Sequence, residues 1–164
     1  MDRLWSPWRM EYIAAAKEHV EDEGCIFCDL PAAGDDEAVH ILARAELAYV
    51  VLNAFPYNPG HVLVAPLRHT GDLESLEEPE LRDIDRLLQR SVTVLRGEMD
   101  PQGFNVGMNL GRVAGAGVPG HLHWHVVPRW NGDTNFMPVV GQTRVLPELI
   151  DETYRKLSPG FAAA

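Results

Sequence analysis

The sequence predicts one α+β domain, in which an antiparallel β-sheet has a long helix and a C-terminal helix packed on one face. The chain has 164 residues, 46% of them hydrophobic, which suits a single domain with its own core. Short runs of strand type fill two parts of the chain, and one segment with helical spacing divides them. We therefore expect a single domain over residues 1–164, with its core at about 38–140 and an N-terminal helix and cysteine element at 4–30.

The N-terminal part consists of two segments of different character. Residues 4–17 mix aromatic and aliphatic side chains with charges, and they predict a short helix after Pro7. Residues 18–37 are acidic and contain Gly and Pro, which predicts an exposed connection around an island of two cysteines. These cysteines, Cys25 and Cys28, are the only two of the chain, too few for a secreted disulfide scaffold.

Three strands of an antiparallel meander are predicted at residues 39–43, 47–53 and 60–66. Each run is short and rich in β-branched or aromatic residues, and turn residues bound it. The period of two returns at residues 103–110 and 121–127, which predict two further strands.

A long helix is predicted over residues 75–99, between the two groups of strands. Apolar residues recur there at intervals of three and four, with charges between them. Ser75 and Glu78 fit a capping box, and Pro79 fits a first helical turn. Residues 145–157 predict the terminal helix.

A glycine-rich loop precedes the last predicted strand, and residues 115–120 spell G-x-G-x-x-G. In dinucleotide-binding folds this fingerprint places a pyrophosphate at the start of a helix. Here Pro119 and an alternating strand pattern follow, so the loop does not predict a dinucleotide-binding fold. The glycines still allow backbone N–H groups to converge on an anion, although a flexible turn is the commoner use of such loops.

The charge of the chain excludes several classes of partner. With 14 Lys and Arg against 24 Asp and Glu, the formal net charge is −10, which argues against non-specific binding to nucleic acid or anionic membranes. No apolar run approaches the roughly 18 residues of a membrane span, and no signal peptide is evident, so we expect a cytoplasmic protein. Residues 47–71 and 101–132 contain no acid, so an anionic ligand would be held there by short-range donors.

Three histidines alternate along the last predicted strand. His121, His123 and His125 would therefore project from the same face. The residues alone leave three readings open: ordinary structural histidines, a zinc site, or phosphate chemistry. In the last case a neutral imidazole attacks phosphorus while a neighbour holds a phosphoryl oxygen or supplies a proton.

The segment His-Leu-His-Trp-His-Val-Val at 121–127 resembles the signature of the histidine triad (HIT) superfamily, nucleotide hydrolases and transferases that act at an α-phosphate. The block 52–68 resembles that of the fragile histidine triad hydrolases. Other matches are closest to the bacterial diadenosine tetraphosphate phosphorylases, and the resemblance runs from residue 4 to about 157. These matches are Leu4-Trp5 with Arg9-Met10, Tyr57-Asn-Pro-Gly-His61, Gly103-Phe-Asn-Val-Gly107, Asn109-Leu-Gly111, and Val127-Pro-Arg-Trp130 followed by Gly132-Asp133 and Asn135-Phe136.

The resemblance implies a HIT fold and an enzyme that cleaves a dinucleoside polyphosphate such as diadenosine tetraphosphate. His123 would be the nucleophile and form a covalent nucleotidyl-histidine, His125 would contact the phosphate and assist the leaving group, and His61 would line the same pocket. Two displacements at phosphorus predict ping-pong kinetics. The closest resemblance favours phosphorolysis to ATP and ADP. A HIT hydrolase, a nucleoside phosphoramidase and a non-catalytic zinc-stabilised nucleotide-binding module are the alternatives.

The resemblance also implies nucleotide contacts. Asn53 would bind the ribose hydroxyls, and Asn109 with the N–H groups near Gly117 and Val118 would hold phosphoryl oxygens. The hydrolase branches usually have Gln and then Ser or Thr where Gly117 and Val118 stand, and the phosphorylases compared have Ser at the first position. The choice between water and inorganic phosphate as second acceptor therefore stays open. A divalent cation is expected to accompany the polyphosphate.

Cys25 and Cys28 supply half of a tetrahedral zinc site, and the alternatives are a reduced thiol pair or a redox dithiol. Resemblance to small bacterial members of the superfamily implies that His69 and His121 complete a structural zinc site. This leaves the other histidines of the pocket free for catalysis. Superfamily members are typically homodimers, which the spare aromatic residues of this chain fit.

Overall fold

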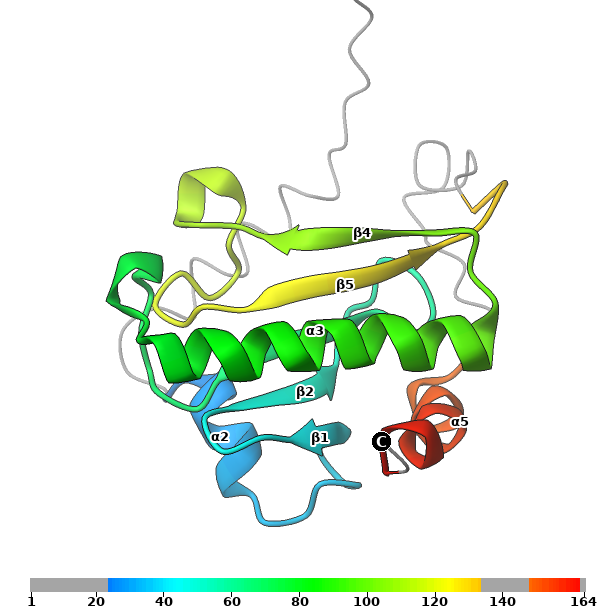
Figure 1. Ribbon diagram of the computed structural model, residues 1–164, viewed down its shortest axis with the longest axis horizontal. Coiled ribbons are helices and arrows are strands. Elements are labelled where there is room, and N and C mark those ends of the chain that lie inside the picture. The colour runs from blue at the N-terminus through cyan, green and yellow to red at the C-terminus, as the bar shows by residue number, and fades with distance from the viewer. Residues whose placement is uncertain (1–23, 134–147, 163–164) are drawn as a thin grey trace, which may run out of the picture.

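A computed structural model describes residues 24–133 and 148–162 of the chain. They form a five-stranded antiparallel sheet with the strand order β1-β2-β3-β5-β4 (Figure 1). The strands are β1 (Ile41–Arg44), β2 (Ala48–Leu52), β3 (Val62–Pro66), β4 (Gly103–Met108) and β5 (Trp124–Arg129). All five predicted strands are present, with ends that differ from the predicted ones. The helix expected at residues 4–17 lies outside the described residues.

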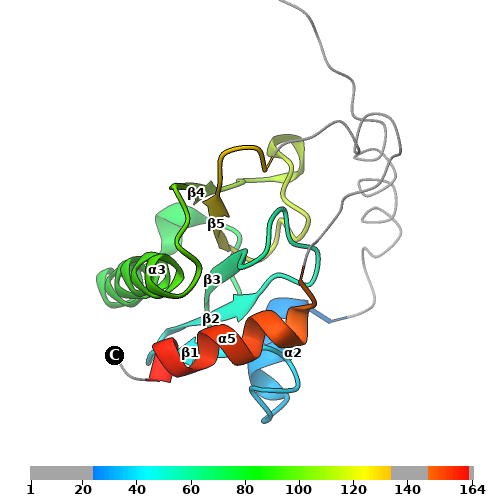
Figure 2. The ribbon, with the colours of Figure 1, turned by 90° about the vertical axis from the view of Figure 1, so that its right-hand side faces the viewer.

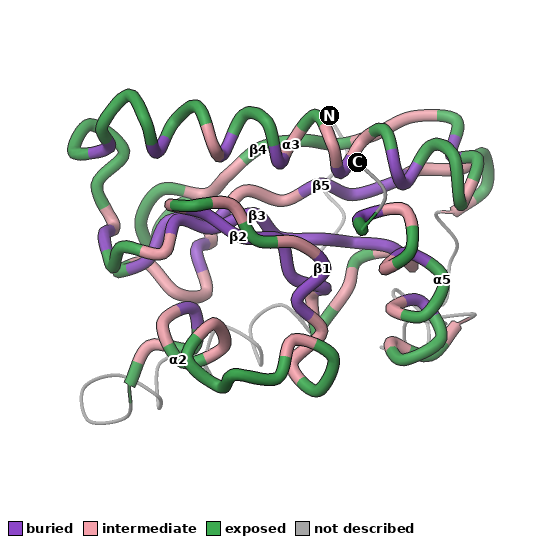
Figure 3. The backbone as a smooth tube through the Cα atoms, turned by 60° about the horizontal axis from the view of Figure 1, so that its bottom comes forward, coloured by how far each residue is buried: buried purple, intermediate pink, exposed green. Residues whose placement is uncertain are grey.

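Helices cover both faces of the central strands, not one. They are α2 (Ile26–Ala32), α3 (Glu78–Met99) and α5 (Ile150–Ala162). Val50 and Val64 are register partners in the apolar cluster that faces α3, whereas Tyr49 and Ala65 are partners in the cluster on the opposite face. Figure 2 and Figure 3 show α2 on that opposite side of the sheet. The expectation that the long helix and the C-terminal helix pack on one face is confirmed by α3 and α5, and the short helix α2, which the sequence did not predict, packs on the second face.

The start of α3 differs from the predicted capping box. The N-cap is Glu77, whose side chain accepts a backbone N–H at Glu80, and the side chain of Glu80 accepts the N–H of Glu77 at 2.9 Å. Ser75 instead ends a 3-10 turn and donates its hydroxyl to the carbonyl of Asp72 at 2.7 Å. Ser75 does not cap α3 because it lies in that turn, two residues before the N-cap. Pro79 lies in the first turn, as predicted.

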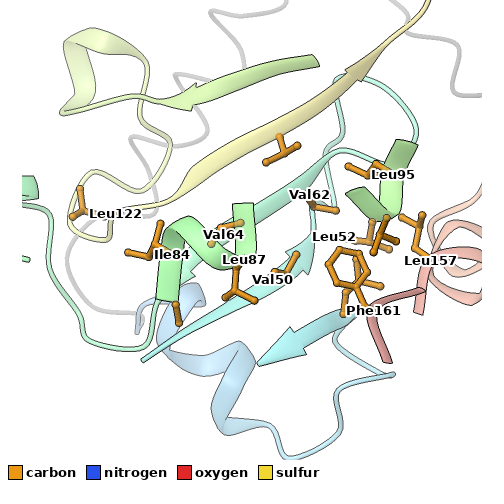
Figure 4. Close-up of a cluster of buried hydrophobic side chains, with 14 of the residues drawn as sticks. Val50, Leu52, Val62, Val64, Ile84, Leu87, Leu95, Leu122, Leu157 and Phe161 are labelled. Carbon is orange, nitrogen blue, oxygen red and sulfur yellow. The ribbon is translucent and has the colours of Figure 1, made fainter. Parts of the chain in front are cut away.

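The C-terminal helix α5 packs across α3 and beside β1. Its buried residues Leu157 and Phe161 complete the cluster on the α3 face (Figure 4). The two helices approach closely at Gly160, where an added Cβ atom would lie 2.8 Å from Cγ1 of Val94. The segment predicted at 145–157 is thus helical from Ile150 onward, and its first residues lie outside the described part. No helix among the described residues has the length and apolar character that a membrane span needs.

The exposed connection predicted at 18–37 contains the short helix α2. Its aromatic residue Phe27 is buried against the sheet, and the carbonyl of Phe27 accepts a 2.8 Å hydrogen bond from the hydroxyl of Tyr49. This buried ring and buried hydrogen bond help to attach the segment to the sheet, which composition alone does not reveal.

Candidate active site and metal centre

The three triad histidines lie at the start of β5, on the sheet face that α2 covers. The strand begins at Trp124, so His125 lies within it and His121 and His123 precede it, which shortens the predicted strand. There the backbone pairs elsewhere, because the N–H of Leu122 donates to the carbonyl of Thr70 at 2.7 Å. The predicted common face is nevertheless confirmed by ring contacts from Phe27 to His121 and His123 and from His123 to His125.

His123 presents its Nε2 atom as a free base. Its Nδ1 atom lies 2.9 Å from the carbonyl oxygen of His121, and since a carbonyl only accepts, Nδ1 bears the proton. Nε2 of a neutral ring then has the lone pair. Burial lowers the pKa of His123 below the ordinary histidine value, so the ring is neutral at pH 7. A neutral imidazole with a defined lone pair is a competent nucleophile.

His61 and His125 form a hydrogen-bonded pair whose polarity is set by the backbone. The N–H of Tyr57 donates to Nδ1 of His61 at 3.1 Å, so the proton of the neutral His61 ring is on Nε2. That Nε2 lies 2.9 Å from Nδ1 of His125 and donates to it. His125 must then bear its own proton on Nε2, a buried atom without a hydrogen-bond partner among the described residues. Its N–H therefore has a hydrogen bond left to make.

Burial, with a smaller effect of His123, lowers the pKa of His125 to about 4. His125 is therefore neutral at physiological pH and acts as a hydrogen-bond donor through Nε2–H rather than as a cation. The series of hydrogen bonds from Tyr57 through His61 to His125 starts at a backbone amide. Its direction therefore does not depend on a titrating group.

The loop before His61 supports this pair. Tyr57 is about half exposed, and its ring stacks on His61 at 4.9 Å and on His125 at 6.0 Å between centroids. Asn58 ties the loop to the far end of β5 through hydrogen bonds to the carbonyl of Pro128 and to Asp133. Sequence reasoning assigned no role to Tyr57 or to Phe27. The available signal was their position inside the motifs Tyr-Asn-Pro-Gly-His and Cys-Ile-Phe-Cys.

The residues expected to bind the nucleotide fall into two places. Asn53 lies beside the pair of His61 and His125: its amide nitrogen is 3.3 Å from Nδ1 of His61, and its carbonyl oxygen accepts the N–H of Phe55. Asn109 instead contacts the glycine loop, where its amide donates to the carbonyl of Gly115 at 3.4 Å. Val118 packs against the cluster around Phe27.

The glycine loop contains a 3-10 turn at Arg112–Ala114, flanked by Gly111 and Gly115, which both have positive φ. Gly117 follows that turn, and no α-helix begins between the turn and β5, as the sequence indicated. The loop is therefore not a dinucleotide fingerprint in the structural sense.

Cys25, Cys28, His69 and His121 form a cluster that could hold a metal ion, with all four ligand atoms within 4.8 Å of one another. Sγ of Cys25 lies 3.3 Å from Nδ1 of His121, and Sγ of Cys28 lies 3.4 Å from Nδ1 of His69. Tetrahedral zinc with two sulfur and two nitrogen ligands has ligand-to-ligand distances of about 3.4–3.8 Å. The donor set and the spacing both fit zinc.

One ligand of the cluster is already oriented for a metal. Nε2 of His121 lies 2.9 Å from the carbonyl oxygen of Pro66 and must donate to it, so Nδ1 has the lone pair that faces the two sulfurs. A histidine whose second ring nitrogen donates to a carbonyl is the usual arrangement of a metal-ligating imidazole.

Two of the three arginines of the acid-free segments, Arg68 and Arg129 but not Arg112, pair with carboxylates from elsewhere in the chain. Arg68 forms a two-pronged contact with Glu80 of α3, and Arg129 forms one with Asp133. Each contact lowers the pKa of the carboxyl and raises that of the guanidinium. Arg68 and Arg129 therefore have their guanidinium groups occupied by Glu80 and Asp133.

Comparisons with known proteins give one consistent family. A model of the HIT domain matches residues 36–132. An AP-4-A phosphorylase of Mycobacterium tuberculosis is 40% identical over 167 residues, covering 99% of this chain and 85% of its own. A bis(5'-adenosyl)-triphosphatase of Saccharomyces cerevisiae is 35% identical over 91 residues, 55% of this chain and 44% of its own. Among solved structures, a Zn-bound histidine triad family protein from Mycobacterium smegmatis has a TM-score of 0.69 at 29% identity, covering 85% of this chain and 94% of its own.

Proposed function

This chain belongs to the HIT family, and we propose that it is an enzyme that cleaves dinucleoside polyphosphates such as diadenosine tetraphosphate at an α-phosphate. The observation that supports this most directly is the pair of fixed tautomers: a lone pair on Nε2 of His123 beside a proton on Nε2 of His125. One ring can attack phosphorus while its neighbour donates to a phosphate oxygen. The relative of M. tuberculosis is named for an activity of this kind.

In the first step Nε2 of His123 attacks the α-phosphorus, and the bond to the bridging oxygen of the polyphosphate breaks. His125 donates a hydrogen bond from its Nε2–H to the departing oxygen and keeps its proton. ATP leaves, and AMP remains bound covalently to His123. The Nδ1–H of His123 keeps its hydrogen bond to the carbonyl of His121, which stabilises the positive charge on the substituted ring.

In the second step an oxygen of inorganic phosphate attacks the same phosphorus from the opposite side, and the P–N bond breaks. ADP leaves and His123 is restored as a free base. The backbone N–H groups near Gly117 and Val118, with Asn109, hold the phosphoryl oxygens, and Asn53 binds the ribose. A divalent cation accompanies the polyphosphate.

Hydrolysis is the second candidate, because the yeast relative is named a triphosphatase. Water then replaces phosphate in the second step, and the product is AMP. Gly117 and Val118 have no side-chain amide or hydroxyl with which to orient water, which favours phosphate as the acceptor.

Zinc is the metal we assign to the cluster of Cys25, Cys28, His69 and His121. When bound, the ion supplies a four-coordinate cross-link with no open position, so its role is structural. It joins α2 to the segment after β3 and to the segment before β5. The test is the metal content of protein purified without added zinc: we expect about one ion per chain, and less than about a tenth contradicts the assignment.

A homodimer, a cytoplasmic location and a single domain over the whole chain complete the proposal. β4 is an edge strand on which Val106 is half exposed, so a second copy could extend the sheet. The cytoplasm keeps thiols reduced, as a cysteine metal site requires. Light scattering should give about twice the 18.3 kDa of one chain.

The deciding experiment is incubation with labelled diadenosine tetraphosphate, with and without inorganic phosphate, followed by acid-free denaturation to trap the adduct. ADP that forms only with phosphate supports a phosphorylase, and AMP without phosphate supports a hydrolase. Binding without an adduct or product indicates a non-catalytic nucleotide-binding module. Full turnover by His123→Asn contradicts the mechanism.

A further inference from the structure

Phe27 lies between the two cysteines of the metal cluster and is in contact with the nucleophile. Only 5% of its surface is exposed. Its ring stacks on His123 with a centroid distance of 4.6 Å and an interplanar angle of 23°. It also contacts His121 in a tilted arrangement at 5.4 Å. One side chain thus touches both the nucleophile and a metal ligand.

The backbone of Phe27 is held from both sides. Its carbonyl accepts the hydroxyl of the fully buried Tyr49, and the N–H groups of Cys28 and Asp29 both bond to the carbonyl of Cys25. Because the flanking cysteines are metal ligands, an occupied metal site restrains the same turn. The Phe27 ring can therefore shift little relative to the sheet.

His123 needs such a restraint. The hydrogen bond from Nδ1 to the carbonyl of His121 holds the ring through one atom, and a tilt of the ring bends and weakens that bond. A tilt moves Nε2, on the far side of the ring, away from the line of attack. A flat aromatic face stacked on the imidazole opposes this motion, and His125 contacts the same imidazole edge-on at 5.2 Å.

We propose that Phe27 is a positioning residue for the nucleophile: its ring, held in place by the cysteine metal element, keeps the imidazole plane of His123 in the orientation that aims Nε2 at phosphorus. This inference rests on the proposed function for its kinetic consequence, although the orientation of the ring is a property of the protein itself. A small misplacement of a nucleophile costs rate rather than ground-state affinity.

The test compares Phe27→Leu with the control Ile41→Val. Ile41 lies in the same apolar cluster as Phe27, and it has no ring that could contact His123. In the zinc-loaded protein, Phe27→Leu should lower kcat by about 10- to 100-fold and change KM by less than about 3-fold. Ile41→Val should leave both within about 2-fold of the original protein. The zinc content of both variants should remain that of the original protein.

A second readout needs no substrate. Nitrogen-15 spectra of the histidine rings at pH 7 should show His123 of the original protein as a single Nδ1–H tautomer. Phe27→Leu should show a mixture or an exchange-broadened signal, and Ile41→Val should match the original. An unchanged tautomer together with a kcat no lower than that of Ile41→Val overturns the proposal.

If the proposed function is wrong, the original protein will not turn over diadenosine tetraphosphate. The tautomer measurement still tests the role of Phe27 in that case, because it needs no substrate. If Phe27→Leu loses zinc or does not fold, Tyr49→Phe takes its place. This variant removes only the hydroxyl that holds the Phe27 carbonyl, and it should lower kcat by about 3- to 10-fold. An unchanged kcat and an unchanged His123 tautomer in Tyr49→Phe overturn the proposal.

Discussion

Nε2 of His61 lies 2.9 Å from Nδ1 of His125, and the proton between them belongs to His61 because the backbone N–H of Tyr57 occupies the other nitrogen of that ring. The pair therefore has one polarity, which ends in a buried N–H on His125. A neutral pair of this kind delivers a hydrogen bond to a phosphate oxygen without a charged group in the pocket.

The first prediction concerns this polarity. His61→Ala removes the donor to Nδ1 of His125, so the second ring can adopt the other tautomer or rotate. We expect kcat for dinucleoside polyphosphate cleavage to fall by about 10- to 100-fold, with a smaller change in KM. Steady-state kinetics with and without inorganic phosphate measures both constants.

His40→Ala is the matched control. His40 is a histidine outside the pocket, where it pairs with Asp151 at 2.7 Å and contacts Tyr154. The His40→Ala variant should retain the original kcat. Equal losses in the two variants would contradict a specific role of His61.

The second prediction is a pH dependence of stability. Burial holds the pKa of His125 at about 4 in the folded chain, against the ordinary 6.5 expected of the unfolded chain. Between these two values the unfolded chain binds more protons, so the free energy of unfolding falls as the pH is lowered from 6.5 towards 4. His125→Asn should remove this part of the slope.

Denaturant titrations of both proteins between pH 4.5 and 7.5, at intervals of about half a pH unit, provide the measurement. Carboxylates titrate in both proteins, so the difference between the two slopes isolates His125. Parallel curves would mean that His125 is not buried as a neutral ring.

The third prediction concerns the metal cluster. Cys25→Ser replaces a thiolate ligand with a poor one, so bound zinc should fall below about a tenth of an equivalent. The melting temperature should fall by at least about 5 °C, since the ion joins segments far apart in sequence. Elemental analysis and a thermal melt, each repeated after chelator treatment, test this. A chelator that lowers the melting temperature of Cys25→Ser as much as that of the original protein would contradict it.

The fourth prediction compares two helical glycines. An added Cβ at Gly97 of α3 meets no atom within 4 Å, so Gly97→Ala should raise the free energy of unfolding by about 0.5–1 kcal/mol. At Gly160 of α5 the same methyl group would lie 2.8 Å from Cγ1 of Val94, a stiff side chain of the facing helix. Gly160→Ala should lower it by about 1–3 kcal/mol. If both substitutions changed the free energy of unfolding in the same direction, α3 and α5 would be able to separate without a cost in stability.

Local pattern was sufficient for the framework of the fold. The period of two identified five strands and the period of three to four identified α3, because each element buries one face or both against its neighbours. Local pattern was insufficient to identify which polar residue caps a helix. The sequence predicts a capping box that starts at Ser75, and only the structure shows that Ser75 ends a 3-10 turn and that Glu77 is the N-cap of α3. The short helix α2 depends likewise on one buried ring at Phe27.

The residue types of the site could be read from the sequence as well. Histidines in alternation, a pair of cysteines and a family resemblance were sufficient to name the triad, His61 and the four residues of the metal cluster. What the sequence could not provide is the protonation pattern of the rings, because each proton position depends on a carbonyl or amide brought near by folding.

The carbonyl of Pro66 orients His121, the carbonyl of His121 orients His123, and the amide of Tyr57 orients the histidine pair. The metal cluster likewise joins Cys25 to His121, 96 residues apart. The sequence by itself thus determined which chemical groups are present and which face of a strand they share. The tertiary structure alone decided which nitrogen is a base and which is a donor, since a hydrogen bond depends on a few tenths of an ångström that no sequence spacing specifies.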